Sequence, residues 1–126
     1  MNNIGLILFD IDGVIRDVTN SYRIAIQETV FFFSGWKPSI QDIDSIKSEG
    51  CWNNDWDLSL EMIKRHQQID NFSLSTPTRS KLIECFENFY FGGDPTRDPN
   101  EWKGLIRNET LLVKKNLFNE LSQQRI

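Results

Sequence analysis

Two patterns of hydrophobic positions follow one another along this chain of 126 residues. The segment from Ile4 to Phe9 is a nearly continuous apolar run of strand length. Such a run is typical of a central parallel strand that is covered on both faces. From about Thr19 onward the apolar residues recur at helical spacing instead. The chain is therefore expected to pass from one buried strand into a mostly helical region.

Four helices are predicted after the first strand. The first follows a cap at Thr19 or Asn20 and ends at Gly35, and the second runs from a Ser39 cap to Gly50. The third is expected from about Asn54, and the fourth follows Thr76-Pro77, read as a cap and a proline at the first helical position. Their apolar stripes contain Tyr22, Ile26, Val30 and Phe33; Ile40, Ile43 and Ile46; Trp56, Leu60 and Ile63; and Leu82, Phe86, Phe89 and Tyr90.

Candidate chemistry lies directly after the predicted strand. Ligands bind outside the carboxyl ends of strands in open α/β sheets, so Asp10 is expected at the mouth of a site with Asp12 facing the same cavity. Gly13 allows a sharp turn and a close approach of the backbone to a ligand. Two carboxylates this close favour a shared cation or different protonation states. The alternative is a buried strand that merely ends in a turn, where Asp and Gly are common.

The stretch from Asp10 to Asp17 resembles the first motif of the haloacid dehalogenase superfamily. In that motif a hydrophobic strand is followed by Asp-x-Asp-Gly, then Thr or Val, then Leu, Ile or Val, and after one further residue an Asp. Asp10, Asp12, Gly13 and Asp17 match this motif, whereas Val14 stands where Thr is commoner. The resemblance implies that Asp10 is a nucleophile that forms an aspartyl-phosphate and that Asp12 is the general acid and base. It also implies a phosphate-proximal turn at Gly13. Mg²⁺ would be bound by the Asp10 carboxylate and the Asp12 backbone carbonyl.

The order of motif and helices resembles subfamily I of this superfamily, whose helical cap follows the first motif. The implied fold class is α/β, a Rossmann-like core represented by its first strand with an inserted four-helix cap, in a chain that is mostly α-helical. The expected divisions are a first strand and motif loop (1–18), a cap (19–91), a return linker (92–110) and a start of re-entry into the core (111–126). We expect the chain to stop before the second motif, at Arg125-Ile126.

A polar segment between the second and third predicted helices is a candidate for substrate recognition. The resemblance implies that the cap sends a specificity loop towards the nucleophile at this point. Cys51, Trp52, Asn53, Asn54 and Asp55 form the segment, in which the indole offers a flat face and the polar groups offer hydrogen bonds. The alternative is that Asn54 only caps a helix.

A second acidic stretch imitates a later motif of the superfamily. Gly93-Asp94 and Asp98 have the spacing of its fourth motif, but that motif must follow two further strands, and helices occupy the intervening residues. We interpret 92–99 as a loop rich in Pro and Gly. The chain then lacks the later hydroxyl, lysine and acidic groups of the superfamily's active site.

Composition narrows the function classes. The chain is 39% hydrophobic and 25% charged with a net charge of -4, and it shows no basic face of the kind that nucleic-acid binders have. No stretch approaches the ~18 apolar residues of a membrane span. Cys51 and Cys85 have neither metal-ligand spacing nor the density of a disulfide scaffold, which indicates a reducing compartment. A cytoplasmic protein is expected, with no nucleic-acid or membrane partner.

Two hypotheses of function follow. The first is a Mg²⁺-dependent phosphatase that hydrolyses a small phosphorylated metabolite through an aspartyl-phosphate, and that is inactive alone for want of the later motifs. The second is a non-catalytic truncated remnant or subunit. In either case a separate polypeptide is a candidate partner that supplies the rest of the sheet.

Overall fold

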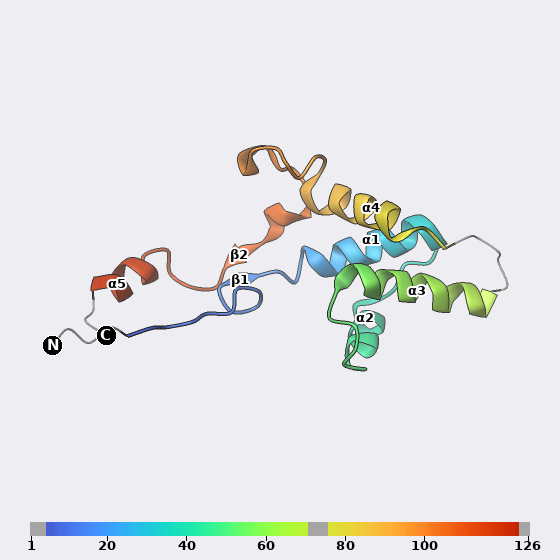
Figure 1. The fold of residues 1–126 in the computed structure, drawn as a ribbon, viewed down its shortest axis with the longest axis horizontal. Helices are drawn as coiled ribbons and strands as arrows, with labels where there is room; N and C mark the ends of the chain where they lie inside the picture. The colour runs from blue at the N-terminus through green and yellow to red at the C-terminus, as the bar shows by residue number, and fades with distance from the viewer. Residues whose placement is uncertain (1–4, 71–75, 124–126) are drawn as a thin grey trace.

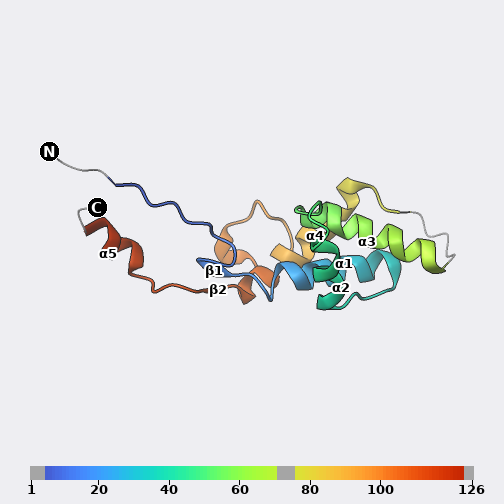
Figure 2. The ribbon, with the colours of Figure 1, turned by 90° about the horizontal axis from the view of Figure 1, so that it is seen from below.

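A bundle of four helices forms one end of the molecule, and an extended arm leads away from it (Figure 1). The computed structural model describes residues 5–70 and 76–123. The arm consists of residues 5–17 and 110–123, which run side by side in both ribbon views (Figures 1 and 2). The elements are β1 (Arg16–Asp17), α1 (Tyr22–Ser34), α2 (Ile40–Lys47), α3 (Asp55–Asp70), α4 (Arg79–Phe91), the 3₁₀ turns η1 (Pro99–Glu101) and η2 (Leu105–Asn108), β2 (Thr110–Leu111) and α5 (Leu117–Gln123).

Helix α1 is the centre of the bundle, because it packs against α2, α3 and α4. The predicted apolar stripes supply most of this core, with two differences. Leu58 and Met62 of α3 are fully buried although the predicted stripe omitted them, and Phe89 of α4 does not belong to the core. Burying these side chains is the main force that holds the helices together. The buried apolar residues are Ala25, Ile26, Val30, Ile43, Leu58, Met62, Ile63, Leu82, Phe86 and Tyr90.

The helix ends follow local capping chemistry, with two corrections to the predicted starts. Helix α2 has the expected capping box, in which Ser39 and Asp42 each accept the other's backbone N–H, and α1 ends at Gly35 with a φ of 76° as predicted. Helix α1 begins after Ser21 rather than Thr19 or Asn20. Helix α4 begins after Thr78, whose hydroxyl accepts the Lys81 N–H, and not after Thr76-Pro77.

The expected Rossmann-like α/β core is wrong for the described part of the chain. That part is a mostly helical small domain with five α-helices and one antiparallel pair of two-residue strands, in which Arg16 pairs with Leu111 and Asp17 with Thr110. Residues 5–9 form no strand, and Ile4 lies outside the described residues. A strand needs neighbours for its backbone groups, and no described segment pairs with 5–9.

Re-entry into a core after residue 110 is also not observed in the described part. The expected apolar start at Leu111 is the end of β2, which pairs with β1 rather than with a larger sheet. Helix α5 follows and contacts the N-terminal segment of the arm through Phe118, whose ring lies edge-on to Phe9 with centroids 5.8 Å apart. Arg125-Ile126 lies outside the described residues. Across the ranges that the structure describes, no helix combines the length and apolar character needed to cross a membrane.

The return segment is tied to the end of α4 by a close backbone contact. The N–H groups of Lys103 and Gly104 donate to the Phe91 carbonyl oxygen at 3.1 and 3.0 Å. A Cβ atom on Gly104 would lie 2.4 Å from the Gly92 nitrogen and from the Tyr90 carbonyl oxygen. Only glycine fits at position 104, and this contact directs the chain back past α4 towards the arm.

Candidate functional site

The motif loop is a compact turn held by its own backbone. The Ile11 carbonyl oxygen accepts the N–H groups of Ile15 and Arg16 at 2.9 and 3.0 Å, and the Gly13 N–H donates to the Arg16 carbonyl oxygen at 2.8 Å. Gly13 has a φ of 77°, a left-handed conformation that a side chain would strain. The sharp turn that the sequence predicts at Gly13 is present, although the strand that was expected to precede it is not.

A cavity of about 820 Å³ lies between the motif loop and the bundle. The motif loop contributes Asp12 and Gly13, and the start of α3 contributes Asn53, Asn54 and Asp55. Two segments that the sequence singled out separately therefore face one space. The remaining lining residues come from all four helices of the bundle and from the residues before α1: Val18, Thr19, Tyr22, Arg23, Lys47, Trp56, Phe86, Glu87, Tyr90 and Phe91.

The proposed nucleophile, Asp10, lies outside the lining of this cavity. Asp10 is exposed, and its Oδ1 accepts the N–H of Ile11 at 2.8 Å. Asp10 precedes the turn and is separated from Asp12 by one residue, and of the two only Asp12 lines the cavity. The role of Asp10 stays a prediction from the motif.

The donor chemistry around Asp10 and Asp12 is compatible with Mg²⁺. Carboxylate and carbonyl oxygens are hard ligands, and Mg²⁺ is commonly held by one or two carboxylates together with water and substrate phosphate. Within residues 5–70 and 76–123, no group of three acidic, His or Cys side chains gathers at one point. The ligands that the motif implies are therefore one carboxylate, from Asp10, and one backbone carbonyl, from Asp12.

The polar segment after α2 divides into two parts. Cys51 is an exposed thiol and does not line the cavity. Trp52 is half-buried and packs against the core of the bundle rather than covering the cavity. Asn54 caps α3, because its Oδ1 accepts the N–H groups of Trp56 and Asp57 at 2.9 and 3.2 Å. Asn54 therefore fills the structural role that was the alternative and lines the cavity as well.

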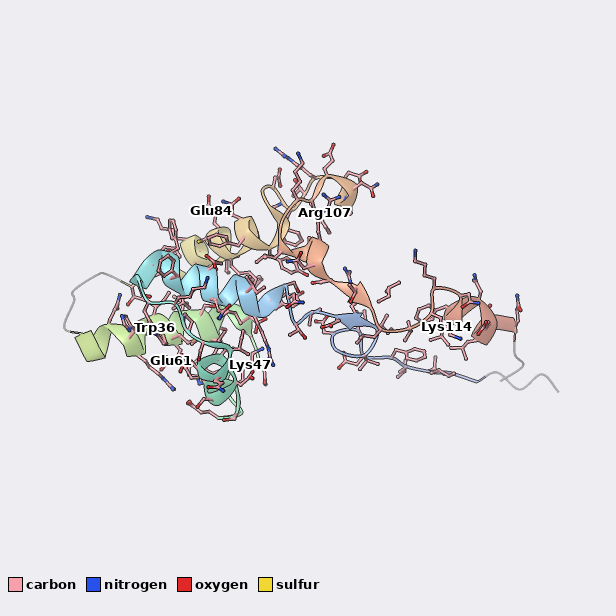
Figure 3. The ribbon with its side chains drawn as sticks, turned by 180° about the vertical axis from the view of Figure 1, so that it is seen from behind. Trp36, Lys47, Glu61, Glu84, Arg107 and Lys114 are labelled. Carbon is pink, nitrogen blue, oxygen red and sulfur yellow. The ribbon has the colours of Figure 1, made fainter. Side chains whose placement is uncertain are left out.

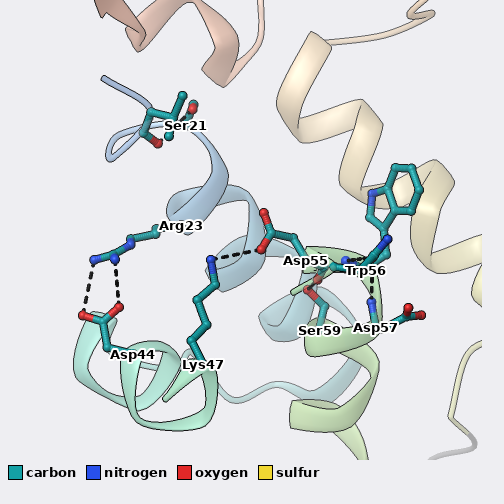
Figure 4. A network of polar contacts seen from close by, with 10 residues as sticks. Ser21, Arg23, Asp44, Lys47, Asp55, Trp56, Asp57 and Ser59 are labelled. Atoms are coloured by element: carbon teal, nitrogen blue, oxygen red, sulfur yellow. Dashed lines mark hydrogen bonds and ion pairs between the residues drawn. The ribbon is translucent and has the colours of Figure 1, made fainter. Parts of the chain in front are cut away.

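Both cationic groups of the cavity are paired with carboxylates (Figure 4). Lys47 Nζ lies 3.1 Å from an Asp55 carboxylate oxygen, and Arg23 makes two contacts of 2.9 and 3.3 Å with Asp44. Sequence analysis did not identify Arg23 or Lys47. Each is a single charged residue of a helix, and no local pattern marks it. Their place beside the cavity follows from how α1 and α2 pack.

Glu109 is the most buried carboxylate near the site, and sequence analysis missed it. Its side chain is 2% exposed although it lies in the return segment. Its Oε1 accepts the hydroxyls of Ser21 at 2.8 Å and Tyr90 at 2.5 Å, and its Oε2 lies 2.7 Å from Arg16 Nη2. Three donors from distant parts of the chain therefore converge on one carboxylate.

The two tyrosines of the chain form one wall of the cavity. The rings of Tyr22 and Tyr90 are stacked with centroids 4.7 Å apart. Burial is the largest cause that raises the pKa of both phenols, and the Glu109 carboxylate further raises the pKa of Tyr90. Both phenols therefore stay protonated at neutral pH.

The stretch that imitates a fourth motif is a loop, as predicted. Asp94 Oδ1 accepts the backbone N–H and the hydroxyl of Thr96 at 2.9 and 2.6 Å. These hydrogen bonds lower the pKa of Asp94. Asp98 likewise accepts the Asn100 N–H at the start of η1. Neither carboxylate lines the cavity.

Comparison with known proteins finds a relative that is longer than this chain. A protein of Phytophthora nicotianae named imidazoleglycerol-phosphate dehydratase is 36% identical over 121 residues, which cover 94% of this chain and 24% of the relative. The chain is therefore homologous to part of that protein and spans about a quarter of its length. No family model matches the chain. No solved structure matches it either.

Proposed function

We propose that this chain carries the nucleophile loop and the helical cap of a Mg²⁺-dependent phosphomonoesterase. The observation that supports this most is the shared cavity, where Asp12 and Gly13 face Asn53, Asn54 and Asp55. A catalytic turn and a polar recognition segment on one cavity of about 820 Å³ suit a small polar phosphate ester.

The chemistry follows from the motif residues. A carboxylate oxygen of Asp10 bonds to the substrate phosphorus while the bond from phosphorus to the leaving oxygen breaks. Asp12 donates a proton to that oxygen, and the alcohol departs. Asp12 then accepts a proton from the water that attacks the aspartyl-phosphate, which releases phosphate and restores Asp10. When bound by Asp10 and the Asp12 carbonyl, Mg²⁺ offsets the repulsion between carboxylate and phosphate.

The relative gives this proposal a test substrate. Its name describes an enzyme that acts on imidazoleglycerol phosphate, a small phosphate ester with several polar groups. We propose that the segment shared with this chain works on such a metabolite within a longer polypeptide, and that the later active-site groups come from outside the described residues.

A second candidate function is a non-catalytic subunit or remnant, and the arm favours it. Leu6 and Leu8 are 82% and 84% exposed, and Ile7 and Phe9 are also exposed. A strand-like segment with two apolar faces matches the centre of a sheet with layers on both sides. In this alternative the chain binds the polypeptide that supplies this sheet and performs no chemistry.

The test replaces the matching segment of the Phytophthora protein with this chain and assays the chimaera and the isolated chain. Imidazoleglycerol phosphate and a generic phosphomonoester are supplied with and without Mg²⁺, and phosphate release and loss of water are measured separately. We expect Mg²⁺-dependent phosphate release by the chimaera that falls by about three orders of magnitude or more in Asp10→Asn and Asp12→Asn.

Asp94→Asn is the matched control, because it removes a carboxylate that does not face the cavity. It should leave phosphate release unchanged. A folded chimaera that loses water from the substrate but releases no phosphate would contradict the phosphatase proposal. That result together with protection of the arm backbone against hydrogen exchange in the chimaera would support the non-catalytic alternative.

A further inference from the structure

Glu109 connects the motif loop of the arm to two helices of the bundle that already pack against each other. Ser21 stands at the start of α1, Tyr90 near the end of α4, and Arg16 at the end of the motif loop. Ser21 is fully buried, and Tyr90 is almost so. Hydrogen bonds to a buried carboxylate are charge-assisted and stronger than those between neutral groups. Glu109 is therefore a strong junction between the bundle and the arm.

Arg16 carries this junction into the motif loop. Its backbone closes the turn, since its N–H donates to Ile11 and its carbonyl oxygen accepts the Gly13 N–H. The backbone of Arg16 also forms an isolated β-bridge with that of Asp12. Fixing the guanidinium of Arg16 on Glu109 therefore fixes the turn that carries Asp12 and Gly13.

Tyr90 connects Glu109 to the cavity wall that the two tyrosines form. Its hydroxyl is held by Glu109, and its ring stacks on Tyr22, which also lines the cavity. The Gly104 contact with Gly92 fixes the return segment just before Glu109. The backbone contact at Gly104 thus restrains the segment that carries the carboxylate, in addition to its three donors.

We propose that Glu109 is a positioning residue that couples the motif loop to the cavity wall, so that Asp12 faces the substrate held by the cap. The catalytic consequence rests on the proposed function, whereas the coupling itself does not. Ser21 and Tyr90 keep Glu109 in place, and Glu109 keeps Arg16 and the turn in place.

The test uses nuclear magnetic resonance of the whole chain, which needs no activity. Amide hydrogen exchange is measured at Gly13 and Arg16 in the motif loop and at Ile26 and Met62 in the bundle. A nitroxide on the exposed Cys51, with Cys85→Ser, reports by paramagnetic broadening whether the Gly13 amide stays near the recognition segment. Glu101→Gln is the matched control, because Glu101 is an exposed carboxylate of the same return segment.

In Glu109→Gln we expect exchange at Gly13 and Arg16 to accelerate by about tenfold or more, the size that loss of a charge-assisted hydrogen bond implies. Broadening of the Gly13 amide should decrease as well. Ile26 and Met62 should keep their protection, and Glu101→Gln should change none of the four amides.

Arg16→Gln is the second variant, because it leaves the hydrogen bonds from Ser21 and Tyr90 to Glu109 intact. Amide exchange at Gly13 should accelerate to the same extent as in Glu109→Gln, and the variant with both substitutions should exchange no faster than either single variant. Equal loss of protection in loop and bundle in both single variants would overturn the proposal and make Glu109 a general stabilising residue. Unchanged exchange at Gly13 in a folded Glu109→Gln variant would also overturn it. Neither result depends on phosphate release, so the coupling can fail while the proposed function holds, and the reverse.

Discussion

The bundle and the arm contain equally apolar segments, but only the bundle buries them. Ile26, Leu58 and Met62 are fully buried between α1, α3 and their neighbours, whereas Leu6 and Leu8 in the arm are more than four-fifths exposed. Figure 3, in which Trp36 and Lys47 mark the bundle and Lys114 marks the arm, shows the two parts at opposite ends of the molecule. The comparison teaches that the helical part completes its core with its own residues, while the arm presents apolar surface for something else to cover.

The largest expected difference between the two regions is the cost of truncating a leucine. Leu58→Ala should lower the free energy of unfolding by about 2–5 kcal/mol, because it removes buried methyl groups and leaves a cavity. Leu8→Ala makes the same chemical change in the arm and should alter it by less than about 0.5 kcal/mol. Chemical denaturation followed by circular dichroism measures both values. A loss in Leu8→Ala as large as that in Leu58→Ala would show that the arm is packed in solution.

The same contrast explains which elements could be predicted from the sequence. The four bundle helices were predicted correctly because a helix satisfies its backbone within itself, and its apolar stripe finds partners a short distance along the chain. A strand over residues 4–9 was expected from its composition, but strand formation depends on neighbours that the described chain does not provide. The predicted starts of α1 and α4 were wrong by one or two residues, because several hydroxyl residues adjoin each start and only packing selects between them.

The candidate site was predictable in part for a related reason. The turn at Gly13 is local and could be predicted from its own residues. The expectation that the segment from Asn53 to Asp55 lies near this turn came from the resemblance, and both segments line one cavity. Glu109 could not be found, because a single acid in a polar linker resembles an exposed residue. Its burial depends on Ser21 and Tyr90, which are distant in sequence. Long-range polar contacts of this kind leave no periodic signal.

A smaller effect is expected at the contact that joins the two regions. Gly104→Ala should cost about 1–3 kcal/mol of unfolding free energy, because its Cβ would lie 2.4 Å from backbone atoms that must move. The backbone at Gly104 has no left-handed φ, so the effect is steric rather than conformational. Denaturation measures the cost, and amide exchange at Gly13 shows whether the motif loop loosens with it.

Lys103→Ala is the control for this contact. It keeps the backbone hydrogen bond to Phe91 and changes an exposed side chain, so it should be close to neutral. Equal stability of Gly104→Ala and the parent chain would contradict the close approach of the return segment to α4.

The smallest expected effect is the pH dependence of stability that comes from the two tyrosines of the cavity wall. The chain has two tyrosines, Tyr22 and Tyr90, and both have a raised pKa, chiefly through burial. Because the folded pKa values lie above the unfolded value of about 10, this contribution to stability is fully present below pH 10 and is lost as the pH rises beyond it. Tyrosinate absorbance should therefore stay low at about pH 10, where an ordinary tyrosine is half ionised.

The unfolded chain supplies the reference for this titration. In denaturant both phenols should ionise together near about pH 10, whereas in the native chain tyrosinate should form at a higher pH. Helical circular dichroism recorded in the same titration shows whether the fold is lost as tyrosinate forms, because the stacked rings belong to α1 and α4. Ionisation of Tyr90 near its ordinary pKa in the folded chain would mean that water reaches its hydrogen bond to Glu109. The bundle would then be as incompletely closed there as the arm is along its length.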